Sequence, residues 1–265
     1  MNFLHAFLLG IIQGLTEFIP VSSTAHLLIG QKLLGIPADD AMFSFLVIVQ
    51  LGTIVSLIIF YWKDLLTIVK ATFNFRRSTP ERNLGFYIIV ATIPALLAGY
   101  LLKDAVETLF RQPMLEASIR LFSAAILLTL AEWLTRKNRS LPTMTWLDAL
   151  IEGLFQIISV FPGASRSGTT ISGGMFRGFD RPSAARFAFL MSVPVMLAAG
   201  GYEILDVLKM PNLGEFLPLL ALGFVTAAIV GWFAIKWLID YLGKHSLYVF
   251  AVYCAVIGTI VFFLR

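Results

Sequence analysis

Charged residues are scarce in this sequence of 265 residues, and cysteine is almost absent. Lys and Arg number 20 and Asp and Glu 16, so 14% of the chain is charged, against about 25% in soluble domains. The single cysteine, Cys254, excludes an intrachain disulfide and a cysteine-based zinc or iron–sulfur site. Hydrophobic residues make up 58% of the chain, and the mean hydropathy is +0.85. This composition excludes disordered, collagen-like and coiled-coil chains and indicates a polytopic membrane protein.

The basic residues are concentrated in four segments, at residues 63–82, 136–139, 177–186 and 236–244. Each segment lies beside an apolar stretch, as cytoplasmic loops of membrane proteins do. The net charge of +4 and the pI near 9.3 therefore indicate membrane topology, and we expect a bilayer and no nucleic acid as partner. Four tryptophans beside these segments fit an interfacial aromatic belt: Trp62, Trp133, Trp146 and Trp237.

Six apolar stretches approach the ~20 residues that span a bilayer, and we expect transmembrane helices at residues 42–62, 84–102, 117–133, 184–202, 216–237 and 247–264. Two further apolar stretches, residues 3–34 and 146–175, are interrupted by proline and hydroxyl residues, and each predicts a re-entrant helix–loop–helix hairpin. No Lys or Arg precedes Lys32, so the first stretch lacks the basic region of a signal peptide, and we expect it in the mature protein.

The two interrupted stretches resemble each other in sequence. A Gln-x-x-x-Glu pattern at residues 13–17 precedes Pro20 and Ser23, and a Glu-x-x-x-Gln pattern at 152–156 precedes Pro162 and Ser165. One hairpin and three spans in each half predict a single membrane domain of two inverted repeats, approximately residues 1–135 and 146–265, whose breaks meet near the midplane. The charges place both termini, residues 37–41 and residues 103–111 outside. The first hairpin then enters from outside and the second from the cytoplasm.

Glu17 and Arg166 are ionisable side chains at membrane depth, where insertion costs about 2.5–3.5 kcal/mol. Gln13 lies four residues before Glu17 and shares its helical face, so hydrogen bonding between helices is the structural alternative for both. His26 lies about one turn after Ser23, and a hydroxyl, an imidazole and a carboxylate at one break predict catalysis. The neighbouring hydroxyls of Ser22, Ser23 and Thr24 could instead be helix caps.

The second break surrounds Arg166 with four hydroxyl residues, Ser165, Ser167, Thr169 and Thr170. A helix N-terminus and a guanidinium fork both suit a phosphate group. The structural alternative is an ion pair of Arg166 with Glu17 or Glu152. The motifs of type 2 phosphatidic acid phosphatases are absent, because Ser172 stands where their second histidine would be, and no cysteine phosphatase loop precedes Arg166.

The segments QGLTEFIPVSSTAH at residues 13–26 and PGASRSGTT at 162–170 resemble undecaprenyl pyrophosphate phosphatase, the bacitracin-resistance family, and the resemblance covers nearly the whole chain. It implies cleavage of undecaprenyl pyrophosphate to the monophosphate and inorganic phosphate in the bacterial plasma membrane. It also implies a divalent cation, for which Mg2+ or Ca2+ held partly by Glu17 suits the oxygen ligands. The family's first motif is Glu/Gln-x-x-x-Glu, and this chain has the Gln form at Gln13.

On this interpretation Ser23, His26, Glu17 and Arg166 are catalytic, and the active site opens to the periplasmic face. Ser23 would attack the terminal phosphorus and His26 would take its proton, although His26 as nucleophile stays open. The residues expected to bind the substrate are Gln13, Ser22, Thr24, Ser165, Ser167, Thr169 and Thr170. The alternative is a lipid-phosphate transporter or flippase, because inverted repeats with broken helices are a transporter plan. A homodimer is possible in either case.

Overall fold

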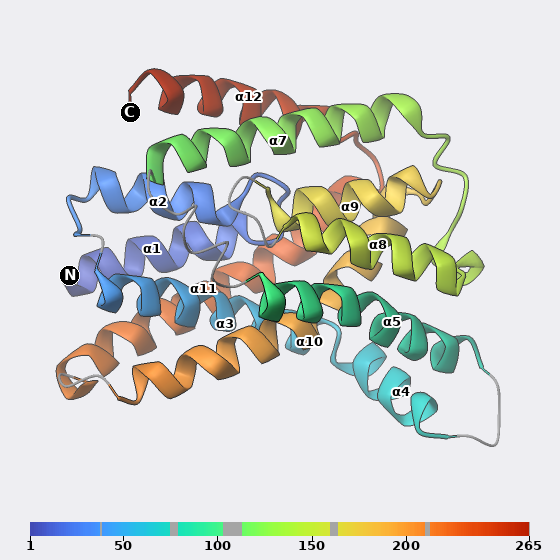
Figure 1. The fold of residues 1–265 in the computed structure, drawn as a ribbon, viewed down its shortest axis with the longest axis horizontal. Coiled ribbons are helices and arrows are strands. Elements are labelled where there is room, and N and C mark those ends of the chain that lie inside the picture. Colours follow the sequence, from blue (N-terminus) through green and yellow to red (C-terminus); the bar gives the residue numbers. More distant parts are fainter. Residues whose placement is uncertain (38, 75–78, 103–112, 160–163, 210–212, 265) are drawn as a thin grey trace.

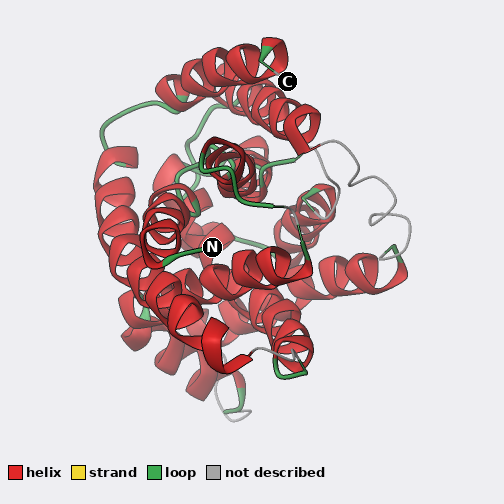
Figure 2. Cartoon of the chain, turned by 90° about the vertical axis from the view of Figure 1, so that its left-hand side faces the viewer, coloured by secondary structure: helices red, strands yellow, loops and turns green. Residues whose placement is uncertain are grey.

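The computed structural model describes residues 1–37, 39–74, 79–102, 113–159, 164–209 and 213–264. Within these residues the chain forms eleven α-helices and one short 3-10 turn at Leu141–Thr143, without a strand (Figure 2). The expected all-α class is confirmed. The loop at residues 103–111, which the charges place outside, and residues 162–163 of the second break lie outside the described residues.

Five helices contain stretches that are long and apolar enough to cross a membrane: α3 (Asp40–Phe60), α5 (Pro80–Leu101), α7 (Pro113–Leu134), α10 (Arg181–Val207) and α11 (Leu213–Leu242). They coincide with five of the six expected spans. The sixth, α12 (Tyr248–Phe263), has 16 residues, which corresponds to about 24 Å at 1.5 Å per residue and is less than the ~30 Å bilayer core. Exposed apolar residues on α5, namely Phe86, Ile89, Ile93 and Leu97, form a face suited to lipid.

The two interrupted stretches fold as pairs of short helices, as their prolines and hydroxyl residues predict. The first pair is α1 (Phe3–Thr16) and α2 (Ser23–Leu33), and the second is α8 (Trp146–Ile158) and α9 (Arg166–Phe176). Ser22 Oγ caps α2 by accepting from the Ala25 amide at 3.4 Å, and Ser165 Oγ caps α9 by accepting from the Gly168 amide at 3.3 Å. Ser22 adopts a left-handed backbone with φ +68°, which costs a non-glycine residue about 1–2 kcal/mol. The first break is therefore a strained turn followed by a capped helix.

Most helices run along the long axis of the molecule, with both termini at one end and the connection between α7 and α8 at the other (Figure 1). Helices α3 and α10 pack against each other, and α7 packs against α12. The first helix of each pair packs on a long helix of the other half of the chain, α1 on α11 and α8 on α5. The second helices, α2 and α9, both pack against α7. This packing brings the two breaks together.

The described parts of the basic segments lie towards the end of the molecule opposite the termini (Figure 1). Arg139 and Arg177 both donate to Asp148, at distances of 2.7 to 3.1 Å, and Glu132 pairs with Lys137 and Arg181. The hydrogen bond with Asp148 raises the pKa of Arg139, although partial burial opposes this. A short helix that the sequence pattern did not predict, α4 (Trp62–Thr72), also lies at this end and packs against α5.

Candidate active site

Glu17 is the centre of a hydrogen-bonded group at the first break. It follows the last turn of α1 and is 5% exposed. Its Oε2 accepts from the Gln13 side-chain amide at 2.6 Å and from Ser23 Oγ at 2.6 Å. Ser23 is the first residue of α2, so the left-handed turn at Ser22 carries its hydroxyl back towards the end of α1. A carboxylate that accepts from a serine hydroxyl is positioned to take its proton.

Arg166 joins this group from the second break, where it is the first residue of α9. Its Nη2 forms an ion pair with Glu17 Oε1, and its Nη1 contacts the sulfur of Met196 on α10. Of the two carboxylates that the sequence left open as partners, Glu17 is the one that it contacts. A second link joins the breaks, because Ser167 Oγ donates to the Ile19 carbonyl at 3.3 Å.

A cavity of about 150 Å³ lies between the two breaks. It is lined by Glu17, Ser22, Ser23, Thr24, Gln50, Arg120, Ser159, Ala164, Ser165, Arg166, Ser167 and Met196. The capped N-termini of α2 and α9 both contribute to its wall, and helix N-termini offer free amides and the positive end of the helix dipole. The cavity therefore combines hydroxyls, guanidinium groups and helix N-termini, which is a chemistry suited to phosphate oxygens.

Three predicted binding residues lie outside this lining. The hydroxyls of Thr169 and Thr170 donate to the backbone carbonyls of the preceding turn of α9, at 2.8 to 2.9 Å. Both side chains are buried there, so they stabilise α9 without facing the cavity. Gln13 lies behind Glu17 and also donates to Thr53 Oγ1 at 3.4 Å.

His26 also lies apart from the cavity. Its Nδ1 is 2.9 Å from the Ser22 carbonyl, and its Nε2 is 2.8 Å from the hydroxyl of Tyr253 on α12. The imidazole and the Tyr253 ring stack at 5.6 Å between centroids. In this arrangement Ser23 donates to Glu17 rather than to His26. His26 thus supports the strained turn at Ser22 from the side of α12.

Five cavity residues were not among the predicted site residues: Gln50, Arg120, Ser159, Ala164 and Met196. Arg120 lies on α7, is 6% exposed and donates through Nη1 to the Ala164 carbonyl at 2.9 Å. The sequence could have identified Arg120, because it is an ionisable residue within the expected span at residues 117–133. The insertion cost that singled out Glu17 applies equally to this arginine.

The cavity offers few carboxylate ligands for a divalent cation. Among the described residues, no group of three His, Cys, Asp or Glu side chains converges. Glu17 is the carboxylate that lines the cavity, and the buried Oε1 of Gln13 has no hydrogen-bond partner. Hard cations such as Mg2+ and Ca2+ bind oxygen ligands of this kind. Glu17 fits part of a coordination shell in the cavity, with Gln13 Oε1 behind it and outside the lining. The other ligands would have to come from a substrate or water.

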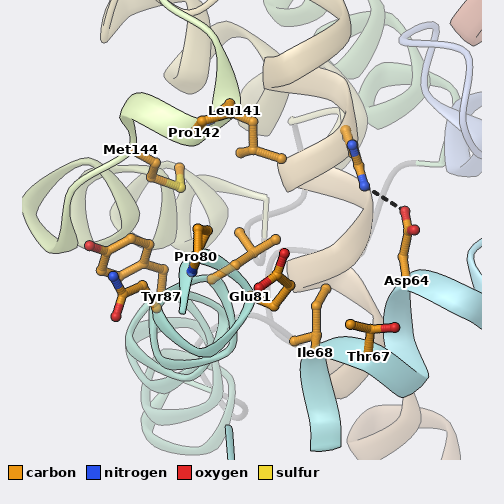
Figure 3. A pocket seen from close by; sticks show the side chains of 12 residues that line it. Asp64, Thr67, Ile68, Pro80, Glu81, Tyr87, Leu141, Pro142 and Met144 are labelled. Carbon is orange, nitrogen blue, oxygen red and sulfur yellow. Dashed lines mark hydrogen bonds and ion pairs between the residues drawn. The ribbon is translucent and has the colours of Figure 1, made fainter. Parts of the chain in front are cut away.

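A larger cavity, of about 380 Å³, lies at the end of the molecule that carries the basic segments (Figure 3). Its wall is formed by α4, the start of α5 and residues 141–144, with the ion pair of Arg186 and Asp64 at 2.6 Å beside it. None of the predicted site residues lines this cavity. Size alone does not identify a site, and the smaller cavity brings together a serine hydroxyl, a carboxylate and guanidinium groups.

The chain is similar to known proteins over almost its full length. The family described as "Bacitracin resistance protein BacA" matches residues 6–260. A curated protein of Chloroherpeton thalassium named undecaprenyl-diphosphatase is 41% identical over 97% of this chain and 95% of its own length. Proteins with the same name from Alkaliphilus metalliredigens and Mycobacterium marinum are 39% and 37% identical, and the alignments cover 98% and 100% of this chain and 98% and 95% of theirs.

Proposed function

The chain belongs to the BacA family of bacitracin resistance proteins, and we propose that it hydrolyses undecaprenyl pyrophosphate to undecaprenyl phosphate and inorganic phosphate. The observation that carries this proposal is the convergence of Ser23, Glu17 and Arg166 in one cavity between two helix breaks. Hydrolysis regenerates a lipid carrier for cell-wall synthesis and opposes bacitracin. The direct test is release of inorganic phosphate from undecaprenyl pyrophosphate by the purified protein in detergent.

Ser23 is the proposed nucleophile. Its Oγ forms a bond to the terminal phosphorus while the bond from that phosphorus to the bridging oxygen breaks, and undecaprenyl phosphate leaves. The hydroxyl proton passes to Glu17 Oε2, to which Ser23 already donates at 2.6 Å. Water then cleaves the phosphoserine and releases inorganic phosphate. Glu17 would pass the first proton to the departing undecaprenyl phosphate and so be ionised again. It would then take a proton from the water, and that proton would return to Ser23 Oγ as the bond from Oγ to phosphorus breaks.

Arg166 is the proposed partner of the transferred phosphoryl group. Phosphoryl transfer depends on positioning and charge neutralisation, and a guanidinium fork matches two phosphate oxygens at once. The ion pair with Glu17 holds the guanidinium beside Ser23 before substrate arrives. The hydroxyls of Ser22, Thr24, Ser165 and Ser167 line the same cavity and would hold the remaining oxygens. Thr169 and Thr170 would act indirectly, by fixing α9 behind Arg166.

The proposed membrane arrangement has six spans and two re-entrant hairpins in inverted repeats. Two features of the packing support it: α1 packs on α11 while α8 packs on α5, and α3 and α10 pack on each other. These are the pairings that a two-fold axis in the membrane plane would exchange. The prenyl chain would then lie among lipid-facing helices and its pyrophosphate in the polar cavity. Association of two copies stays a prediction, which the mass of the detergent-solubilised particle would check.

We expect the end of the molecule that carries the termini to face outward, because the basic segments lie at the other end. A cysteine introduced at the exposed Asp39 should then react with an impermeant thiol reagent in intact cells, and a cysteine at the exposed Arg136 should react only after lysis. Background labelling should be low, because the native Cys254 is buried. Protection of the Asp39→Cys variant together with labelling of the Arg136→Cys variant would reverse the orientation.

We expect hydrolysis to need a divalent cation, Mg2+ or Ca2+. Such an ion, when bound, neutralises phosphate charge. Glu17 and Gln13 would be its protein ligands, and the substrate's oxygens would complete the coordination. The affinity of the protein for the ion should therefore be weak without substrate. Exhaustive chelation should lower turnover by roughly 10²-fold, the scale of losing one electrostatic stabiliser. The Gln13→Glu variant should bind Mg2+ more tightly by calorimetry without substrate. Full activity after chelation would contradict the requirement.

A lipid-phosphate transporter is the second candidate function. It is favoured by the packing of α1 on α11 and of α8 on α5, because these two pairs would be related by the two-fold axis of an inverted repeat. A carrier needs the anion site but no nucleophile. Phosphate release by purified protein separates the two functions, because transport alone leaves the pyrophosphate bond intact.

A further inference from the structure

Arg120 is a second arginine in the candidate active site, and it comes from α7 rather than from either helix pair. Its side chain reaches the second break, where Nη1 donates to the carbonyl of Ala164 at 2.9 Å. Ala164 immediately precedes Ser165, the cap of α9, and Arg166. Arg120 therefore lies on the same wall of the cavity as the N-terminus of α9.

The charged residues that line the cavity are Glu17, Arg120 and Arg166. Glu17 pairs with Arg166, and among the described residues the lining holds two guanidinium groups and one carboxylate. Glu116, one turn before Arg120 on α7, is buried and interacts electrostatically with Arg120, but it does not line the cavity. An arginine that lines a cavity between two helix N-termini is placed to contact an anionic ligand.

We propose that Arg120 binds the phosphate group of the substrate that is not transferred, and so makes the site selective for a pyrophosphate over a monophosphate. This inference rests on the proposed function. Ser23 and Arg166 meet at Glu17 and define where the reacting phosphoryl group lies. A pyrophosphate has a second anionic group next to the first, and Arg120 supplies a second guanidinium fork for it. The monophosphate product and free phosphate lack this second anionic group.

A purely structural role is the competing interpretation. The bond from Arg120 to the Ala164 carbonyl could serve only to hold the second break in place. That role would lower stability and turnover together, and it would weaken phosphate and pyrophosphate binding alike. The ratio of the two affinities therefore distinguishes a ligand contact from a support.

The experiment compares wild type with Arg120→Gln and Arg120→Lys, at fixed ionic strength and fixed Mg2+. Binding of inorganic pyrophosphate and of inorganic phosphate is measured by calorimetry, and kcat and KM are measured on undecaprenyl pyrophosphate. Arg120→Gln should weaken pyrophosphate binding about 10- to 100-fold, the loss of a charged hydrogen-bonding partner. Phosphate binding should change much less, and KM should rise more than kcat falls. Arg120→Lys should lie between, since it keeps the charge without the fork. Arg186→Gln, outside this cavity, is the matched control.

An unchanged ratio of pyrophosphate to phosphate affinity in Arg120→Gln overturns the proposal, as does wild-type protein that does not prefer pyrophosphate. Should Arg120→Gln not fold, Arg120→Lys decides by the same ratio, and an unchanged ratio there contradicts the contact. Loss of selectivity in a protein whose wild type releases no phosphate from the lipid would support the Arg120 contact and refute the proposed hydrolysis. The two proposals therefore fail separately.

Discussion

Replacing Ser23 by alanine is expected to lower turnover of undecaprenyl pyrophosphate by roughly 10³-fold or more, because it removes the covalent route. The fold should survive. Ser22, not Ser23, caps α2, and within the described part of the chain the Ser23 hydroxyl donates to the side chain of Glu17 rather than to a backbone carbonyl. The measurement is phosphate release by purified Ser23→Ala, with the thermal midpoint of unfolding recorded alongside. A variant that folds normally and keeps more than about a tenth of wild-type turnover would make Ser23 structural.

Three further variants distinguish loss of a nucleophile from loss of a structural contact. Ser22→Ala removes the helix cap and should cost about 1 kcal/mol of stability with a much smaller loss of turnover than Ser23→Ala. Ser56→Ala removes a buried hydroxyl that donates to its own helix, outside the cavity, and should leave turnover near wild type. His26→Ala should lose less than Ser23→Ala, because His26 contacts Ser22 and Tyr253 rather than the cavity. The reverse order, with His26→Ala inactive and Ser23→Ala active, would identify His26 as the nucleophile.

Replacing Arg166 by lysine is expected to lower turnover by about 10²- to 10³-fold, although the charge is kept. Lysine is a point charge without the planar fork that binds two phosphate oxygens. The loss should appear in kcat, because the contact strengthens as charge develops on the transferred group. Arg186→Lys, in an ion pair with Asp64 at the other end of the molecule, should behave like wild type. Near-normal kcat in Arg166→Lys would show that charge alone suffices.

The Arg166→Ala variant needs a companion, because it leaves the buried Glu17 carboxylate without its guanidinium partner. Removing one member of a buried ion pair typically costs about 3–5 kcal/mol. The double variant Glu17→Gln/Arg166→Ala should recover much of that stability, as measured by thermal unfolding. It should remain inactive, since both the base and the phosphate contact are gone. Recovery of turnover in the double variant would contradict both roles.

Much of the fold could be predicted from hydropathy, because a bilayer core demands apolar stretches of a defined length. The five long helices and the two interrupted helix pairs lie where the pattern places them. Two elements differ. The sixth expected span forms the 16-residue α12, and the basic segment at residues 63–82 contains α4. Helix α4 is amphipathic and packs its buried Ile68 and Thr72 against α5, a partner that a hydropathy window does not consider.

The sequence by itself determined the class of the protein, the positions of the two breaks and the residue types that gather there, since apolar length, proline and buried charge are local properties. Only the tertiary structure decided which of those residues meet. In the structure Ser23 donates to Glu17, and His26 contacts Tyr253. Arg166 pairs with Glu17 rather than with Glu152. The hydroxyls of Thr169 and Thr170 donate to carbonyls at the start of α9, and Arg120 of α7 joins the cavity lining. Those choices depend on the rotation and packing of helices that are up to about 230 residues apart in sequence. The direction of each side chain depends on how neighbouring helices rotate and position its own helix. The spacing of residues along one segment does not determine that rotation.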